Sequence, residues 1–166
     1  MSMILLPYTH SCFVCGVDNP AGLQLKFHAK DGMVQADFRP RPQHQGYRDI
    51  VHGGVIASAL DEVMFWVASY EGRQFYVSAE LSVRYMKKVQ VGCDYRLVSR
   101  VAGRQRRIFL TEAELRAVAD DSVCATASGR FFPVPLDQVP LDHEDFVTDP
   151  KALPLEDMLP GWKADV

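Results

Sequence analysis

Asp61 is the residue of this sequence whose type and position most clearly suggest chemistry. It lies within residues 55–70, a stretch whose apolar residues cover almost every side of the helix that it predicts. An ionised carboxylate costs several kcal/mol to bury without partners. Asp61 must therefore be paired, protonated or turned toward a cleft, where it can act as a nucleophile or general base. A structural carboxylate that holds nearby backbone groups is the alternative.

Two glycines, Gly53 and Gly54, follow His52 at the predicted start of the same helix. Glycine lets a ligand approach the backbone closely, and free N–H groups at a helix N-terminus stabilise negative charge. An isolated Gly-Gly pair is more often a simple turn. Together with Asp61, however, it supplies what hydrolysis of an acyl group requires, an oxyanion donor and a carboxylate.

The spacing between these residues predicts an assembly. Gly53 and Asp61 are eight residues apart, which is about 12 Å along one helix axis, so the two cannot reach one carbonyl carbon. If both act in one site, a second copy of the chain must supply one of them. An antiparallel pair of helices about a two-fold axis would then create two equivalent sites. We therefore expect a homodimer, with a dimer of dimers left open.

Glu62 follows Asp61 directly and points about 100° away from it around the predicted helix. We therefore expect one of the two acids to face a site and the other to face a surface or a partner.

The segments expected to position this helix are strands. Residues 23–28 and 34–39 alternate apolar and polar side chains around Asp31-Gly32, a pattern that predicts a hairpin. Glu71-Gly72 is expected to end the helix. Four further strands are predicted at 77–86, 95–101, 106–116 and 122–132. Their short connections favour an antiparallel sheet, so we predict an α+β fold in which a curved sheet of about six strands wraps one long buried helix.

The composition restricts the class of protein. The 166 residues suit one domain, and 48% apolar with 23% charged residues indicates a globular protein rather than a disordered one. A net charge of −3 and the lack of a long apolar run favour neither nucleic acid nor a membrane as partner. With only four cysteines and no secretory signal pattern, we expect the cytoplasm.

The composition changes near residue 133. The segment 133–166 contains six of the ten prolines and eight of the 21 acidic residues. That proline spacing excludes a long helix or a central strand. We therefore predict a domain at 1–132 and an acidic arm at 133–166 that lies over the body or over a neighbouring subunit. A floppy terminus is the alternative.

The motif His52-Gly53-Gly54, with Asp61 eight residues after Gly53 and the strand VSAELSVRY at 77–85, resembles a known family. It is similar to the hotdog-fold acyl-CoA thioesterases of the phenylacetic-acid-pathway (PaaI-like) type, which include the human mitochondrial THEM-type enzymes. The loop 8–22, with its Cys-x-x-Cys-Gly motif, looks like a subgroup of uncharacterised members. The resemblance covers residues 12–134. It implies a hotdog fold that hydrolyses an acyl-CoA thioester to a carboxylic acid and coenzyme A, without a further cofactor.

The resemblance also implies roles for single residues. Gly53 matches the residue whose backbone N–H polarises the thioester carbonyl, and Asp61 matches the acid that attacks the acyl group or activates water. His52 matches a histidine at the mouth of the site, and Ser78 matches a serine that helps to hold the water in some members. Gln45 is the counterpart of an asparagine in several relatives and has a longer reach.

Recognition of coenzyme A is expected from a second group of residues. Arg104 and Arg106 belong to the densest basic cluster, and guanidinium groups suit phosphate oxygens. Family members often bind these phosphates along comparable hairpins, although a solvated strand face is the alternative. Lysine also replaces the proline with which the family strand usually ends. The residues expected to bind substrate are Gly54, Val77, Lys87, Arg104 and Arg106.

Cys12 and Cys15 have the spacing of half a zinc site, and His10 lies just before them. Since no second Cys-x-x-Cys pair exists, we expect no metal. Two other functions remain open for the fold. One is an enoyl-CoA hydratase or dehydratase, for which His52 offers the histidine of the required His–acid pair. The other is a non-catalytic module that binds acyl-CoA.

Overall fold

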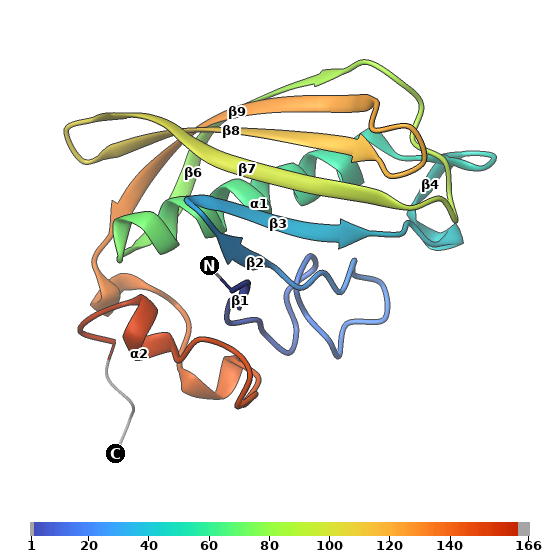
Figure 1. Cartoon of the computed structure of the whole chain (residues 1–166). Helices are drawn as coiled ribbons and strands as arrows, with labels where there is room; N and C mark the ends of the chain where they lie inside the picture. The colour runs from blue at the N-terminus through green and yellow to red at the C-terminus, as the bar shows by residue number, and fades with distance from the viewer. Residues whose placement is uncertain (1, 163–166) are drawn as a thin grey trace.

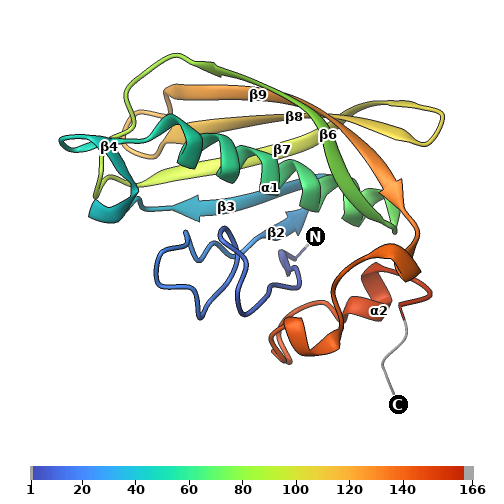
Figure 2. The same cartoon turned by 180° about the vertical axis from the view of Figure 1, so that it is seen from behind.

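One long helix lies against a curved sheet of seven antiparallel strands (Figures 1 and 2). The computed structural model describes residues 2–162. The helix α1 (Gly53–Gly72) contacts the five longest strands, and the sheet has the order β1-β2-β3-β7-β8-β9-β6. The predicted α+β fold is therefore confirmed. The sheet strands are β1 (Ile4–Leu5), β2 (His28–Lys30), β3 (Met33–Phe38), β6 (Phe75–Tyr85), β7 (Tyr95–Gln105), β8 (Ile108–Ala117) and β9 (Val123–Val134).

Helix α1 extends beyond the predicted stretch at both ends. It begins at Gly53, where the side chain of His52 accepts a hydrogen bond from the Gly54 N–H at 2.9 Å and caps the helix. The helix includes Gly72 and is terminated by Arg73, whose backbone is left-handed. The predicted stop at Glu71-Gly72 is thus wrong by one residue, because a non-glycine residue takes the left-handed position.

The first predicted hairpin is only partly correct. Strands β2 and β3 pair across Asp31 and Gly32, which both have positive φ, as a two-residue turn requires. Residues 23–27, however, are not part of the sheet. Gln24 has a positive φ of 55°, and the N–H groups of Leu23 and Leu25 bond to carbonyl groups of residues 13 and 14 in the N-terminal loop. A ladder with a strand cannot form there, although the apolar side chains of this segment are buried as the pattern predicted.

Three of the four later strands are longer than predicted, β8 is one residue shorter, and β6 differs in its environment. Strand β7 continues through Gly103 to Gln105, so Arg106 lies in the turn and not in a strand. Strand β6 forms one edge of the sheet and pairs with β9 alone. The apolar side chains of Val77 and Leu81 on β6 are 42% and 37% exposed, so the apolar face of this predicted strand is not buried within one chain.

Two smaller regions complete the structure. Strands β4 (Gln45–Tyr47) and β5 (Ile50–Val51) form a separate two-stranded sheet just before α1. The C-terminal segment, with the short helix α2 (Leu155–Met158), lies beside the N-terminal strand and the end of α1 (Figure 1). None of the described helices has the length and apolar character needed to cross a membrane.

The C-terminal segment is attached to the N-terminal residues through its backbone. Val147 and Leu153 donate N–H bonds to the carbonyl groups of Tyr8 and Leu5, at 3.0 and 2.8 Å. Met158 and Leu159 are almost completely buried. Residues 163–166 of the predicted arm lie outside the described residues.

Gly72 offers a test of how closely α1 packs against the sheet. A Cβ at this position would lie 2.5 Å from the ring of Tyr76 and 2.6 Å from that of Phe109. Because both rings would have to move, we expect Gly72→Ala to lower the free energy of unfolding by about 1–3 kcal/mol in urea denaturation. Gly103→Ala is the control, since its Cβ would only touch Leu110 at 3.6 Å. Equal stability of the two variants would contradict the packing described.

Candidate functional site

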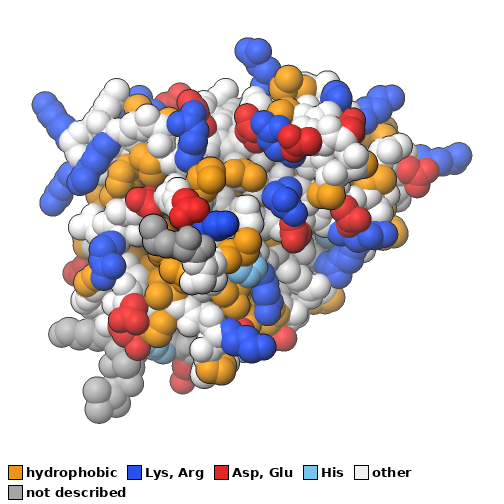
Figure 3. Space-filling model, in the orientation of Figure 1, with side chains coloured by type: hydrophobic (Ala, Val, Ile, Leu, Met, Phe, Trp, Pro, Cys, Tyr) orange, Lys and Arg blue, Asp and Glu red, His pale blue; other side chains and the backbone are white. Residues whose placement is uncertain are grey.

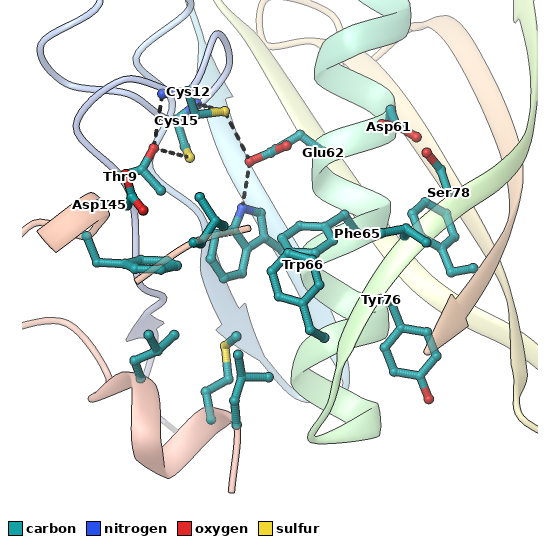
Figure 4. A pocket seen from close by; sticks show the side chains of 18 of the residues that line it. Thr9, Cys12, Cys15, Asp61, Glu62, Phe65, Trp66, Tyr76, Ser78 and Asp145 are labelled. Atoms are coloured by element: carbon teal, nitrogen blue, oxygen red, sulfur yellow. Dashed lines mark hydrogen bonds between the residues drawn. The ribbon is translucent and has the colours of Figure 1, made fainter. Parts of the chain in front are cut away.

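A cavity of about 380 Å³ opens beside the middle of α1, at the junction of four parts of the chain. Its walls come from the N-terminal loop, from α1, from β6 with β9, and from the C-terminal segment (Figure 4). This volume lies within the range of ligand pockets, which are mostly apolar with a few polar groups. The apolar walls include Phe65, Trp66, Phe75, Phe146, Met158 and Leu159.

Asp61 lies at the boundary of this cavity. It also lines a second hollow of about 320 Å³ between α1 and β6, together with Ser58, Ser78 and Glu80. Its Oδ1 atom is buried and has no hydrogen-bond partner among the described residues. The predicted carboxylate in a buried helix therefore lies at a cleft.

Ser78, on β6, points its hydroxyl toward Asp61 (Figure 4). Burial raises the pKa of Asp61 above its ordinary value, and the Ser78 hydroxyl partly opposes this by stabilising the charged form. The structure thus brings together two of the residues predicted to act in one site. A carboxylate with a raised pKa is a stronger base than an exposed aspartate once it is ionised.

The other predicted groups lie at the start of α1. Gly54 donates its N–H to His52, as described above, and the carbonyl oxygen of Gly53 accepts a hydrogen bond from the Tyr85 hydroxyl at 2.8 Å. The N–H of Gly53 has no acceptor among the described residues. This N–H and the helix dipole together are suited to stabilise a negative oxygen. Gln45 is exposed, and its side-chain oxygen accepts the Asp49 N–H at 3.3 Å.

Within one chain, these two groups of residues are apart. Because Gly53 and Asp61 belong to one continuous helix, they are separated by about 12 Å along its axis. Tyr85 contacts the helix start, whereas Ser78, at the other end of β6, faces Asp61. The structure therefore divides the predicted catalytic residues into a helix-start group with His52 and Gly53 and a mid-helix group with Asp61 and Ser78.

The residues predicted to bind coenzyme A also lie in separate parts of the structure. Lys87 follows the end of β6 that contacts the helix start. Arg104 pairs with Phe109 in a ladder that continues through Phe131 to Ser78, so it lies three strands from the mid-helix group. Basic side chains accordingly project from both ends of the sheet in Figure 3, including the β7–β8 hairpin at the upper left. Val77 is exposed and lines the cavity beside Ser78.

Glu62 is a residue whose role sequence reasoning missed. We expected only one of the two acids to face a site, but Glu62 and Asp61 both line the cavity, since the cavity extends around this side of α1. Burial raises the pKa of Glu62 to about 8, and the neighbouring Cys12 sulfur adds to this effect. Its Oε1 accepts a hydrogen bond from the Trp66 indole N–H at 3.2 Å.

Cys12 and Cys15 also line the cavity and are free thiols. Hydrogen bonds from the Cys15 thiol and from nearby backbone N–H groups lower the pKa of Cys12, whereas the same contact and burial raise the pKa of Cys15. The spacing of these cysteines was visible in the sequence. Their proximity to Glu62, 50 residues away from Cys12, was not.

Comparison with known families gives a partial match. Residues 49–124 match the family model described as the thioesterase superfamily. This range contains the helix-start and mid-helix groups, apart from Gln45. No curated protein matches the chain at a significant level.

Solved structures extend the similarity to the fold. A thioesterase superfamily protein is 26% identical with a TM-score of 0.69, over 75% of this chain and 60% of its own length. A thioesterase superfamily protein from Shewanella loihica is 28% identical with a TM-score of 0.58, over 67% of this chain and 91% of its own. A Streptococcus mutans protein, solved with acetyl CoA bound, shares the fold at 15% identity and a TM-score of 0.59, over 81% and 90% of the two chains. These matches confirm the resemblance to hotdog-fold thioesterases.

Because the walls of the cavity are mostly apolar, we predict that it binds apolar ligands. An environment-sensitive dye such as anilinonaphthalene sulfonate is expected to bind with increased fluorescence. Leu141 lines the cavity, so Leu141→Trp fills part of it and should weaken binding about tenfold, a loss of about 1.4 kcal/mol. Gln138→Trp places the same side chain at an exposed position of the same segment that does not line the cavity, and it should not weaken binding. Equal affinity of the two variants in a fluorescence titration would show that the dye binds elsewhere.

Proposed function

We propose that the protein hydrolyses acyl-CoA thioesters, with Asp61 as nucleophile or general base and the Gly53 N–H as oxyanion donor. The observation that carries the proposal is the position of Asp61, which lines both an apolar cavity and a second, more polar hollow and whose buried Oδ1 has no hydrogen-bond partner among the described residues. A thioester carbonyl there is within reach of a carboxylate, with an apolar chain on one side and a polar carrier on the other.

The environment of each part of the substrate supports this orientation. The apolar cavity suits an acyl chain, because its walls are aromatic and aliphatic. The hollow between α1 and β6 is open and suits the pantetheine arm. Acetyl CoA in the Streptococcus mutans structure is itself a thioester. We assign the phosphates to the exposed basic residues Lys87, Arg104 and Arg106, and Gly54 and Val77 to contacts nearer the thioester.

We further propose that the working form is a homodimer in which each site combines Gly53 of one subunit with Asp61 and Ser78 of the other. The separation of about 12 Å along one helix means that a site made by one chain cannot contain both Gly53 and Asp61. Strand β6 offers the contact surface, since one of its edges has no partner among the described strands and it exposes Val77, Leu81 and Tyr85. Two antiparallel copies joined there would bring unlike ends of their helices together.

Asp61→Asn tests the chemical step. Removing the nucleophile or base should reduce kcat by at least about a hundredfold, while folding and self-association remain. The measurement is thiol release from a panel of acyl-CoA esters, followed with a thiol-reactive dye, alongside sedimentation to establish the assembly. Glu71→Gln is the control, because Glu71 is an exposed acid on the same helix.

Normal turnover by Asp61→Asn would contradict this mechanism. If no ester released thiol but crotonyl-CoA were hydrated, the protein would be a hydratase. Binding of acyl-CoA without either reaction would indicate a non-catalytic module.

Gly53→Pro removes the oxyanion donor with little disturbance. Proline is well tolerated at the first position of a helix, and His52 already has the extended backbone, φ −63° and ψ 136°, that a following proline requires. Loss of one donor should reduce kcat about 10²–10³-fold. Gly53→Ala is the matched control, since it keeps the N–H and adds a Cβ that lies 3.4 Å from the Tyr85 hydroxyl; the contribution of the donor is the loss of kcat that Gly53→Pro shows beyond Gly53→Ala.

Mixing the two inactive variants tests the shared site. In a dimer of one Asp61→Asn chain and one Gly53→Pro chain, one of the two sites has both intact groups, and the other has neither. We therefore expect activity to return when the variants are mixed and allowed to exchange subunits. No recovery, despite mixed dimers seen by native mass spectrometry, would exclude the shared site and leave hydrolysis itself to be judged from the panel of esters.

A further inference from the structure

Three potential metal ligands meet in the wall of the cavity. The Sγ atoms of Cys12 and Cys15 and a carboxylate oxygen of Glu62 all lie within 4.8 Å of one another (Figure 4). The two cysteines come from the N-terminal loop, and Glu62 comes from α1. The absence of a second Cys-x-x-Cys pair led us to expect no metal, but the fold supplies a third donor that the cysteine spacing does not reveal.

The loop that carries the cysteines holds their sulfur atoms in place. The N–H groups of Val14 and Cys15 donate to the Sγ of Cys12 at 3.2 and 3.5 Å, which stabilises a thiolate. Gly16 continues this tight turn by donating its N–H to the Cys12 carbonyl at 2.9 Å. A side chain on Gly16 would collide with that carbonyl oxygen. The hydroxyl of Thr9 lies 3.5 Å from the Sγ of Cys15 and accepts the Cys12 N–H at 3.2 Å.

The third donor is also oriented. Trp66, one helical turn after Glu62, donates its indole N–H to Glu62 Oε1, and the Cys12 Sγ lies 3.8 Å from the same oxygen. In a tetrahedral zinc site the metal lies about 2.3 Å from sulfur and about 2.0–2.2 Å from a carboxylate oxygen, so neighbouring ligand atoms are about 3.5–3.8 Å apart. The observed separation is close to this range. The indole N–H acts as the outer hydrogen bond that commonly orients a ligating carboxylate.

The charge of the cluster favours a cation. Three groups that become anions converge here, and none of the ion pairs among the described residues brings a Lys or Arg to Glu62. His10, the histidine closest in sequence, instead pairs with Asp18 at 2.7 Å and is partly exposed. Buried acids without a compensating charge are costly, and a divalent cation would balance them.

We propose that Cys12, Cys15 and Glu62 form a transition-metal site that binds zinc. Two thiolates favour zinc over magnesium or calcium, and three protein ligands leave a fourth position for water or for a group that enters the cavity. On binding, the protons still held by the two thiols and by the Glu62 carboxyl pass to solvent, so the metal is held by two thiolates and one carboxylate. The site lines the same cavity as Asp61 but uses none of the residues assigned to hydrolysis, so the proposal does not depend on thioester hydrolysis.

Cobalt provides a direct test. Untagged protein is purified under reducing conditions, its zinc is measured per chain, and the chelator-treated protein is titrated with Co²⁺. We expect one metal per chain and a thiolate-to-cobalt charge-transfer band in the near ultraviolet. Cys12→Ser and Cys15→Ser should lose the band. Glu62→Gln should keep it but weaken binding at least about tenfold.

Two variants serve as controls. Cys93→Ser removes an exposed thiol and Cys124→Ser a buried one, both outside the cluster, and neither should change the stoichiometry. Circular dichroism establishes that each variant is folded. If Cys15→Ser does not fold, because Cys15 is buried, the more exposed Cys12→Ser decides.

Three results would overturn the proposal. The first is the absence of a charge-transfer band while both thiols react as free. The second is equal metal binding by Cys12→Ser. The third is a Cys12–Cys15 disulfide in the protein with no metal bound after its reduction, which would make the pair a redox dithiol instead.

Discussion

The packing of α1 against the sheet is the interaction on which the rest of the structure depends. Nine of the helix residues are buried, and they lie on all sides because the sheet curves around the helix while the two terminal segments close the remaining side. Carboxylates on such a helix are best accommodated where this enclosure opens. Asp61 and Glu62 lie at that opening, which is why two adjacent acids in an apolar helix share one cavity. The site is thus a consequence of incomplete enclosure.

The rigidity of the same helix separates the two halves of the proposed chemistry. A helix rises 1.5 Å per residue, so no side-chain movement brings the Gly53 N–H to Asp61. Strand β6 follows the helix and repeats this separation, with Tyr85 at one end and Ser78 at the other. The proposed dimer would give each chain a complete site through a symmetric partner, and it would also cover the exposed apolar edge strand.

Sequence patterns predicted the elements whose signals are local. The helix, the Asp31-Gly32 turn and the antiparallel strands follow from periodicity and turn chemistry, and Asp61 follows from its improbable place in an apolar helix. The strand predicted at residues 23–27 was wrong. The positive φ of Gln24 directs the backbone hydrogen bonds of this segment to the N-terminal loop, although its side chains still alternate between apolar and polar. The exposure of β6 was also missed. Alternating apolar and polar residues show that one face of a strand is apolar, but they do not show which part of the protein covers that face. Glu62 was missed as a partner of Cys12 because only the folded chain joins residues 50 positions apart.

The C-terminal segment shows how composition and structure combine at the cavity. Its prolines lack the N–H groups needed for a continuous strand, so it is attached through a few single backbone bonds to the N-terminal residues. Its apolar side chains then complete the cavity wall, with Phe146 and Met158 facing the helix residues Phe65 and Trp66. The N-terminal loop that receives these bonds also carries Cys12 and Cys15. A metal held between that loop and Glu62 would link the loop directly to α1 and, through the loop, to the C-terminal segment, which are three of the four parts of the wall. The shape of the proposed acyl cavity would then depend on a cluster that takes no part in the proposed hydrolysis.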